Sequence, residues 1–101
     1  MEYALTALAS CVTTSIVYHA AAKGIKLNSV ESKLEGDIDL RGFLGMSKDV
    51  SPGYKEIRMN FKIDSDASPD QLKELIEYAP SLSPVFSTIT RAVPASVKLA
   101  D

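Results

Sequence analysis

The feature that most constrains this chain is an uncharged run near its start. From Tyr3 to Ala22 the sequence contains no Asp, Glu, Lys or Arg, and also no Pro or Gly. Lys23 and Gly24 follow, and glycine is suited to the left-handed residue that ends many helices. This pattern predicts one long helix over Tyr3–Lys23, about 30 Å in length at about 1.5 Å per residue.

Apolar side chains occur on more than one side of this predicted helix. One side carries Leu5, Ala9, Val12, Ile16 and Ala20, and another carries Ala4, Ala7, Leu8, Cys11, Ser15, Tyr18 and Ala22. A helix that is apolar all round is covered all round, so we interpret it as a central core helix. A membrane span is the alternative, but the run is mostly Ala interrupted by Ser and Thr, and we expect no membrane association. Glu2 stands where a signal peptide would carry positive charge, which argues against a signal peptide. We therefore expect a cytoplasmic protein.

The rest of the chain alternates between strand and helix patterns. A period of two over Val30–Arg41 and again over Ile57–Ile63 predicts two antiparallel strands joined by a Gly- and Pro-containing loop. Ser68-Pro69-Asp70-Gln71 predicts a capped amphipathic helix that Pro80 ends, and Ser83-Pro84 predicts a short helix over Val85–Thr90. Alternation in Val93–Leu99 predicts a last strand. The fold class is therefore α+β, with the order helix, strand, strand, helix, short helix, strand.

Composition narrows the possible functions. With 101 residues the chain is expected to form one domain over residues 1–101. A net charge of −2 and scattered basic residues argue against nucleic acid as a partner. A single cysteine excludes an intramolecular disulfide and a cysteine-based zinc site, and no cofactor motif is present. We expect no cofactor and no metal. The alternating acids Glu35, Asp37 and Asp39 are most simply a solvated strand face.

The predicted sheet and one amphipathic helix are too small to cover a helix that is apolar on every side. Something further has to cover it, most simply a second copy of the chain. We therefore predict a homodimer.

Cys11 is the candidate nucleophile, because it is the only soft nucleophile in the chain. A reactive thiolate needs a nearby positive charge, and His19 lies about 12 Å further along the same helix. The alternative reading of Cys11 is a small buried hydrophobe. The apolar loop residues Phe43, Leu44 and Met46 suggest a lid over a small apolar pocket near the helix.

Taken together, several segments resemble one known family. The helix ALTALASCVTTSIVYHAAAKGIKL, the strand-loop-strand with DIDLRGFLG and PGY, the SPDQL helix and APSLSPVF are similar to the OsmC/Ohr family, named for osmotically inducible protein C and organic hydroperoxide resistance. The resemblance covers essentially the whole chain, but only the C-terminal two-thirds or so of a typical member. It implies a domain that lacks the family's N-terminal strands.

The resemblance implies a dimeric thiol peroxidase that reduces organic hydroperoxides. Cys11 matches the family's peroxide-attacking cysteine, whereas the family's second, resolving cysteine falls on Ser83. The family's glutamate falls at Met1 or Glu2, and its arginine belongs to N-terminal strands that this chain lacks. Two functions stay open: a peroxidase in which Cys11 depends on an external resolving thiol, and a non-catalytic dimer that binds a small apolar ligand or a partner.

Overall fold

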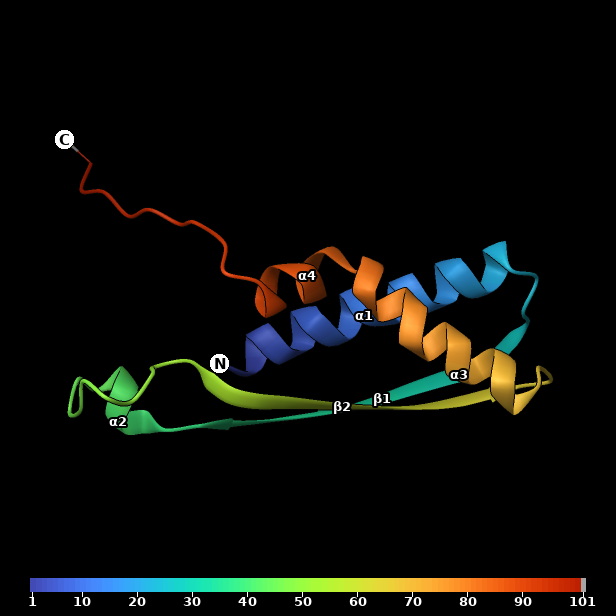
Figure 1. Ribbon diagram of the computed structural model, residues 1–101, viewed down its shortest axis with the longest axis horizontal. Coiled ribbons are helices and arrows are strands. Elements are labelled where there is room, and N and C mark those ends of the chain that lie inside the picture. The colour runs from blue at the N-terminus through green and yellow to red at the C-terminus, as the bar shows by residue number, and fades with distance from the viewer. Residues whose placement is uncertain (101) are drawn as a thin grey trace.

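A computed structural model of the chain, in which residues 1–100 are described, confirms the α+β fold (Figure 1). The helices lie on one face of a long two-stranded antiparallel sheet, and the other face of the sheet is bare (Figure 1). The elements follow the order α1 (Glu2–Ala22), β1 (Leu27–Ile38), α2 (Leu40–Phe43), β2 (Tyr54–Ser65), α3 (Pro69–Tyr78), the 3₁₀ turn η1 (Ala79–Leu82) and α4 (Pro84–Thr90).

The long helix α1 ends as its sequence predicts. Gly24 has a positive φ of 72°, and its N–H donates to the carbonyl of Ala21 at 3.1 Å. The N–H of Ile25 then reaches back to the carbonyl of Ala20 at 2.8 Å. This pair of bonds is a Schellman ending, which satisfies carbonyls that a helix C-terminus otherwise leaves unpaired.

The hairpin of β1 and β2 confirms the predicted antiparallel pair. Val30 lies opposite Ile63 and Leu34 opposite Met59, so the apolar members of both strands share the face that meets the helices. A Cβ at Gly36 would lie 2.6 Å from the ring of Tyr54, so glycine permits this ring to cross the neighbouring strand. Beyond α1 the hairpin continues to the α2 turn, which projects past the end of the helical layer (Figure 1).

The second half of the chain forms a helical arm along α1. Ser68 and Gln71 form the predicted capping box, with both side chain-to-backbone bonds present. Ser83 caps α4, because its Oγ accepts a hydrogen bond from the N–H of Phe86 at 3.3 Å. The turn η1, which the sequence reading treated only as the end of α3, lies between these helices and contacts α1.

The hydrophobic core is small. Its fully buried apolar side chains come from one face of α1 and from α3 with η1, and they are Leu8, Val12, Ile16, Ala20, Leu75 and Ala79. Inward-facing residues of the hairpin, such as Met59 and Phe61, pack against this core but remain partly exposed. The expectation that α1 is covered on every side is therefore not met by the described residues of one chain.

The predicted last strand is not part of the sheet. Residues 92–100 contain no helix or strand, and they run outward from α4 away from the hairpin (Figure 1). Val97 and Leu99 are each 99% exposed. An alternating segment becomes a strand only beside an edge that can accept its hydrogen bonds, and no such edge of this chain lies next to residues 92–100.

Candidate functional site

Cys11 lies in the middle of α1 and borders an open hollow on the molecular surface. The thiol is free and partly exposed. The hollow has a volume of about 390 Å³ and is lined by Cys11, Thr14, Ser15, Tyr18, His19, Leu82 and Pro84. We call this the Cys11 hollow. Within a single chain, Cys11 is therefore not fully buried, because part of its surface reaches solvent.

The far wall of the Cys11 hollow is the turn that carries Ser83. Leu82 and Pro84 line the hollow, so the position that the family resemblance assigns to a second cysteine lies beside it. Ser83 itself is fully buried and its hydroxyl is engaged as the α4 cap. This wall is fixed to α1 by Ser15, whose Oγ donates a 2.6 Å hydrogen bond to the carbonyl of Ala79. The sequence alone gave no sign of this bond, because its partners are 64 residues apart.

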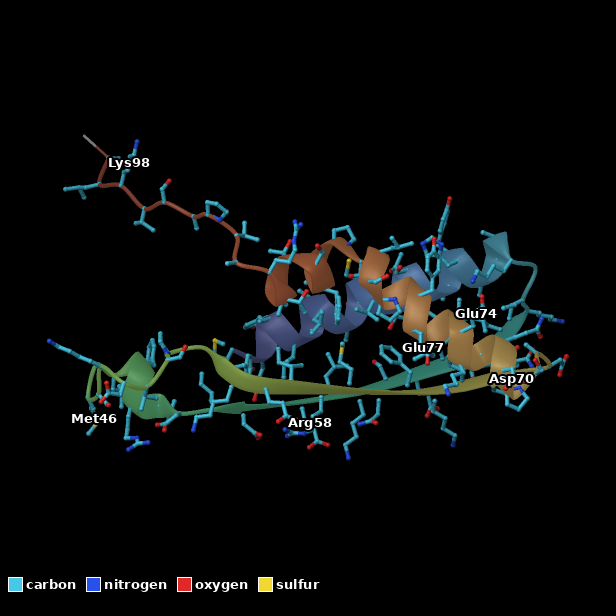
Figure 2. The ribbon with its side chains drawn as sticks, in the orientation of Figure 1. Met46, Arg58, Asp70, Glu74, Glu77 and Lys98 are labelled. Carbon is cyan, nitrogen blue, oxygen red and sulfur yellow. The ribbon has the colours of Figure 1, made fainter. Side chains whose placement is uncertain are left out.

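No lysine or arginine lines the Cys11 hollow within the described chain. Arg41 and Arg58 are held on the hairpin by carboxylates, at 2.6 Å from Asp39 and 2.8 Å from Asp37. Arg58 lies on the sheet face that points away from the helices (Figure 2). Its hydrogen bond and charge lower the pKa of Asp37 below the ordinary aspartate value, and Asp37 in turn raises the pKa of Arg58.

His19 contributes its ring to the hollow, but it belongs to an aromatic group at the end of α1. Its ring meets the rings of Tyr18 and Tyr78 edge to face, at centroid distances of 5.0 and 5.5 Å. Lys23 lies 4.8 Å from the centroid of the Tyr78 ring. This group ties the end of α1 to the end of α3.

Glu2 is not brought to Cys11 within one chain. The two residues are nine positions apart on α1, which places them on opposite flanks of the helix. Glu2 lines a separate hollow with Leu5, Thr6, Ala9, Ser32 and Leu34 on the β1 side. Any role of Glu2 beside a Cys11 thiol would require a second subunit.

A second hollow lies on the other side of the helical arm, over β2. It has a volume of about 350 Å³ and is lined by Leu8, Tyr54, Lys55, Glu56, Ile57, Met59, Phe86, Ile89 and Thr90. We call this the Phe86 hollow. The sequence does not predict it, because its walls come from three elements whose packing no local pattern reveals.

The predicted lid residues Phe43, Leu44 and Met46 line neither hollow. They are 63–72% exposed, and Met46 lies at the hairpin tip, far from the helices (Figure 2). The lid hypothesis is wrong for a single chain.

The described residues contain no group of three or more His, Cys, Asp or Glu side chains that could hold a metal ion.

The α1 helix has the length and the apolar composition that a membrane-spanning helix needs. Core helices of water-soluble proteins can have the same length and composition, and α1 packs against the sheet and the helical arm along one face.

This arrangement of a thiol-bearing helix over a hairpin, with a helical arm at its side, defines an OsmC-like domain. The family model for OsmC-like protein matches residues 1–98, so the chain belongs to the OsmC-like family. A similar solved structure is the crystal structure of an OsmC like protein from Mycoplasma pneumoniae, with 25% sequence identity and a TM-score of 0.77. The match covers 87% of this chain and 59% of that chain, so this chain spans well under two-thirds of its neighbour's length. A search of curated proteins found no match.

Proposed function

We propose that this chain is a one-cysteine thiol peroxidase that reduces organic hydroperoxides through Cys11. The observation that carries the proposal is the position of the only thiol of the chain, partly exposed at the border of an open hollow on the helix that matches the family. The walls of the hollow include Leu82, Pro84 and the ring of Tyr18. Such walls suit an alkyl or aryl hydroperoxide better than hydrogen peroxide, because the organic group gains apolar contacts.

In the proposed reaction, the thiolate sulfur of Cys11 attacks the terminal oxygen of the hydroperoxide. The O–O bond breaks, the leaving alkoxide takes up a proton, and an alcohol and the sulfenic acid of Cys11 are formed. A small external thiol then attacks the sulfenic acid, which releases water and leaves a mixed disulfide on Cys11. A second external thiol attacks the external sulfur of this disulfide, so that the Cys11 thiolate leaves and the two external thiols are joined in a disulfide. The peroxide is reduced by two electrons that the external thiols supply. This recycling requires a reducing compartment, which supports a cytoplasmic location.

Ser83 explains why an external thiol is needed. It lies between the lining residues Leu82 and Pro84, at the position where the family resemblance places a resolving cysteine, and its hydroxyl cannot form a disulfide. No lysine or arginine among the described residues that line the Cys11 hollow supplies the positive charge that a reactive thiolate needs. In this proposal it comes from outside the single chain.

The proposal is tested by intact-mass analysis after one equivalent of an aryl hydroperoxide is added in the presence of a sulfenic-acid trap. We expect one trap adduct per chain, located at Cys11, and no adduct in Cys11→Ser. An equal amount of hydrogen peroxide should react more slowly. A thiol that stays unmodified in the folded protein, but reacts after unfolding in urea, would contradict the proposal.

A second candidate function is binding of a small apolar ligand without catalysis. The Phe86 hollow favours it, because this hollow is lined mainly by apolar side chains and does not include Cys11. Calorimetry with a medium-chain alcohol tests it. We expect binding that Cys11→Ser leaves unchanged and that Ile89→Asp abolishes, since Ile89 lines the hollow and is already 41% exposed. Absence of binding to the parent chain would exclude this candidate for that ligand class.

A further inference from the structure

The Phe86 hollow has apolar walls on three sides, from α1, β2 and α4. Five of its lining side chains are apolar, and they are Leu8, Ile57, Met59, Phe86 and Ile89. Its volume of about 350 Å³ lies at the lower end of the range of about 300–1,000 Å³ that small-molecule sites occupy. A site of this size and lining suits a single small molecule with an apolar chain.

Most of the polar side chains around this hollow already have partners in the protein. The Tyr54 hydroxyl donates to the carbonyl of Met1 at 3.0 Å, and the Thr90 hydroxyl donates to a backbone carbonyl of its own helix at 2.8 Å. The Glu56 carboxylate lies 3.5 Å from Arg58, whose side chain is on the outer face of the hairpin (Figure 2). The protons of both hydroxyls are therefore committed, and the negative charge of Glu56 is paired.

Lys55 differs from these groups. Among the described residues that line the hollow, it carries the only positive charge. Its Nζ is 3.6 Å from Asp39, which is beyond hydrogen-bonding distance. Asp39 is held more closely by Arg41, through three side-chain hydrogen bonds of which the shortest is 2.6 Å. The Lys55 ammonium therefore keeps N–H donors for a further acceptor, and its side chain is 59% exposed.

The register of the hairpin accounts for the position of Lys55. Asp37 lies opposite Glu56, but the next residue of β1, Ile38, lies opposite Tyr54. Lys55 is therefore an extra residue in β2 without a partner on β1, which is a β-bulge. A bulge interrupts the alternation of a strand and redirects the side chain of its extra residue. In this hairpin it places a lysine at the border of an apolar hollow.

We propose that the Phe86 hollow binds an unbranched aliphatic carboxylate of medium chain length. The chain contacts the apolar walls, and the carboxylate accepts hydrogen bonds from the Lys55 ammonium. The head group is an acceptor with one negative charge, because an ammonium only donates and because the described lining offers one available cation. This inference rests on the second candidate function above and names its ligand class. It does not depend on the chemistry of Cys11.

A titration followed by NMR compares octanoate with 1-octanol, which has the same chain length and no charge. Both ligands should shift the methyl signals of Ile57 and Ile89, and neither should shift those of Ile25, which lies beyond the other end of α1. Octanoate should bind about threefold to fivefold more tightly than octanol, and salt at about 0.5 M should reduce this difference. Each methylene added between hexanoate and octanoate should raise the affinity up to about fourfold.

Substitutions of Lys55 test the role of its charge. Lys55→Gln should remove the preference for octanoate and leave the binding of octanol unchanged, whereas Lys55→Arg should retain the preference. Lys62→Gln is the matched control, because it removes one positive charge from an exposed position of the same strand that does not line the hollow. Cys11→Ser should bind both ligands as the parent does. Circular dichroism confirms the folding of each variant.

The possible failures can be told apart. Equal affinity for octanoate and octanol, or a preference that survives Lys55→Gln, would overturn the assignment of a carboxylate and leave the apolar site of the second candidate function in place. Absence of methyl shifts with both ligands would overturn the carboxylate and the apolar site together. Shifts confined to Leu82, at the border of the Cys11 hollow, would place the ligand in the wrong hollow and overturn the proposal as well.

Discussion

At the scale of single residues, Ser15 connects the two walls of the Cys11 hollow. Its hydroxyl donates to the buried carbonyl of Ala79, and it stands one helical turn beyond Cys11. The bond fixes where η1 and the following turn lie relative to the thiol. Ser15 is thus a positioning residue for the hollow, although serine in the middle of a helix is otherwise unfavourable.

Ser15→Ala should lower the free energy of unfolding by about 1–3 kcal/mol, because the Ala79 carbonyl is left buried without its partner. Each kcal/mol corresponds to a decrease of roughly 4–8 °C in Tm for a domain of this size. Thr14→Ala is the matched control, since the exposed Thr14 hydroxyl bonds only to the carbonyl of Ser10 in its own helix, at 2.9 Å. Thermal unfolding followed by circular dichroism checks both. Equal Tm values for the two variants would contradict this role of Ser15.

The roles of residues that interact with near sequence neighbours could be predicted from the sequence. The roles of residues that interact with distant parts of the chain could not. Gly24 and the Ser68–Gln71 capping box depend on neighbours within a few positions, and both were recognised. The bond from Ser15 to Ala79 depends on how η1 packs on α1. Likewise, Cys11 was identified as the candidate nucleophile, but the wall opposite it was not.

At the scale of elements, the outer face of the hairpin is held by ion pairs. Arg58 on β2 contacts Asp37, Glu35 and Glu56 at 2.8, 3.7 and 3.5 Å. Arg58 lowers the pKa of Asp37 first through their hydrogen bond and then through its charge. A carboxyl whose pKa is lower in the folded state stabilises that state above its ordinary pKa of 3.8, and the stabilisation is lost as the pH falls through the lowered value.

Asp37→Asn should therefore reduce the urea midpoint of unfolding slightly at about pH 6, and the difference from the parent should shrink as the pH falls below the ordinary aspartate pKa of 3.8. The effect is small because the pair is solvent-exposed, and salt at about 1 M should shrink it further. Asp64→Asn serves as the control, because Asp64 lies on the partner strand β2 of the same hairpin and forms no ion pair with another described residue. A difference that grows toward acid pH would be the opposite of this expectation.

The elements also show where sequence patterns stop. Period-two alternation predicted β1 and β2 because each supplies the other's hydrogen bonds, and their register follows from the shared apolar face. The same alternation in residues 92–100 gave no strand in the described chain. Alternation of apolar and polar residues predicts which face of a segment is buried. It does not predict which strand will pair with that segment.

At the scale of the whole molecule, stability should depend on protein concentration. The fully buried apolar core consists of side chains from two parts of the helical layer, and the inward face of the hairpin is only partly covered. If the second copy completes this core, mass action raises Tm as the concentration rises. We expect a Tm that increases over a hundredfold range of concentration for the parent chain. A constant Tm in the parent would contradict it.

The open edges of the hairpin have a consequence for how this protein behaves when it is concentrated. Each of the two strands of the described sheet has one side on which its backbone N–H and C=O groups lack a partner strand. Such an edge can pair with an extended segment of another molecule, and it does so without regard to side-chain sequence. The tendency of the protein to aggregate at high concentration should therefore be governed by whatever covers these two edges.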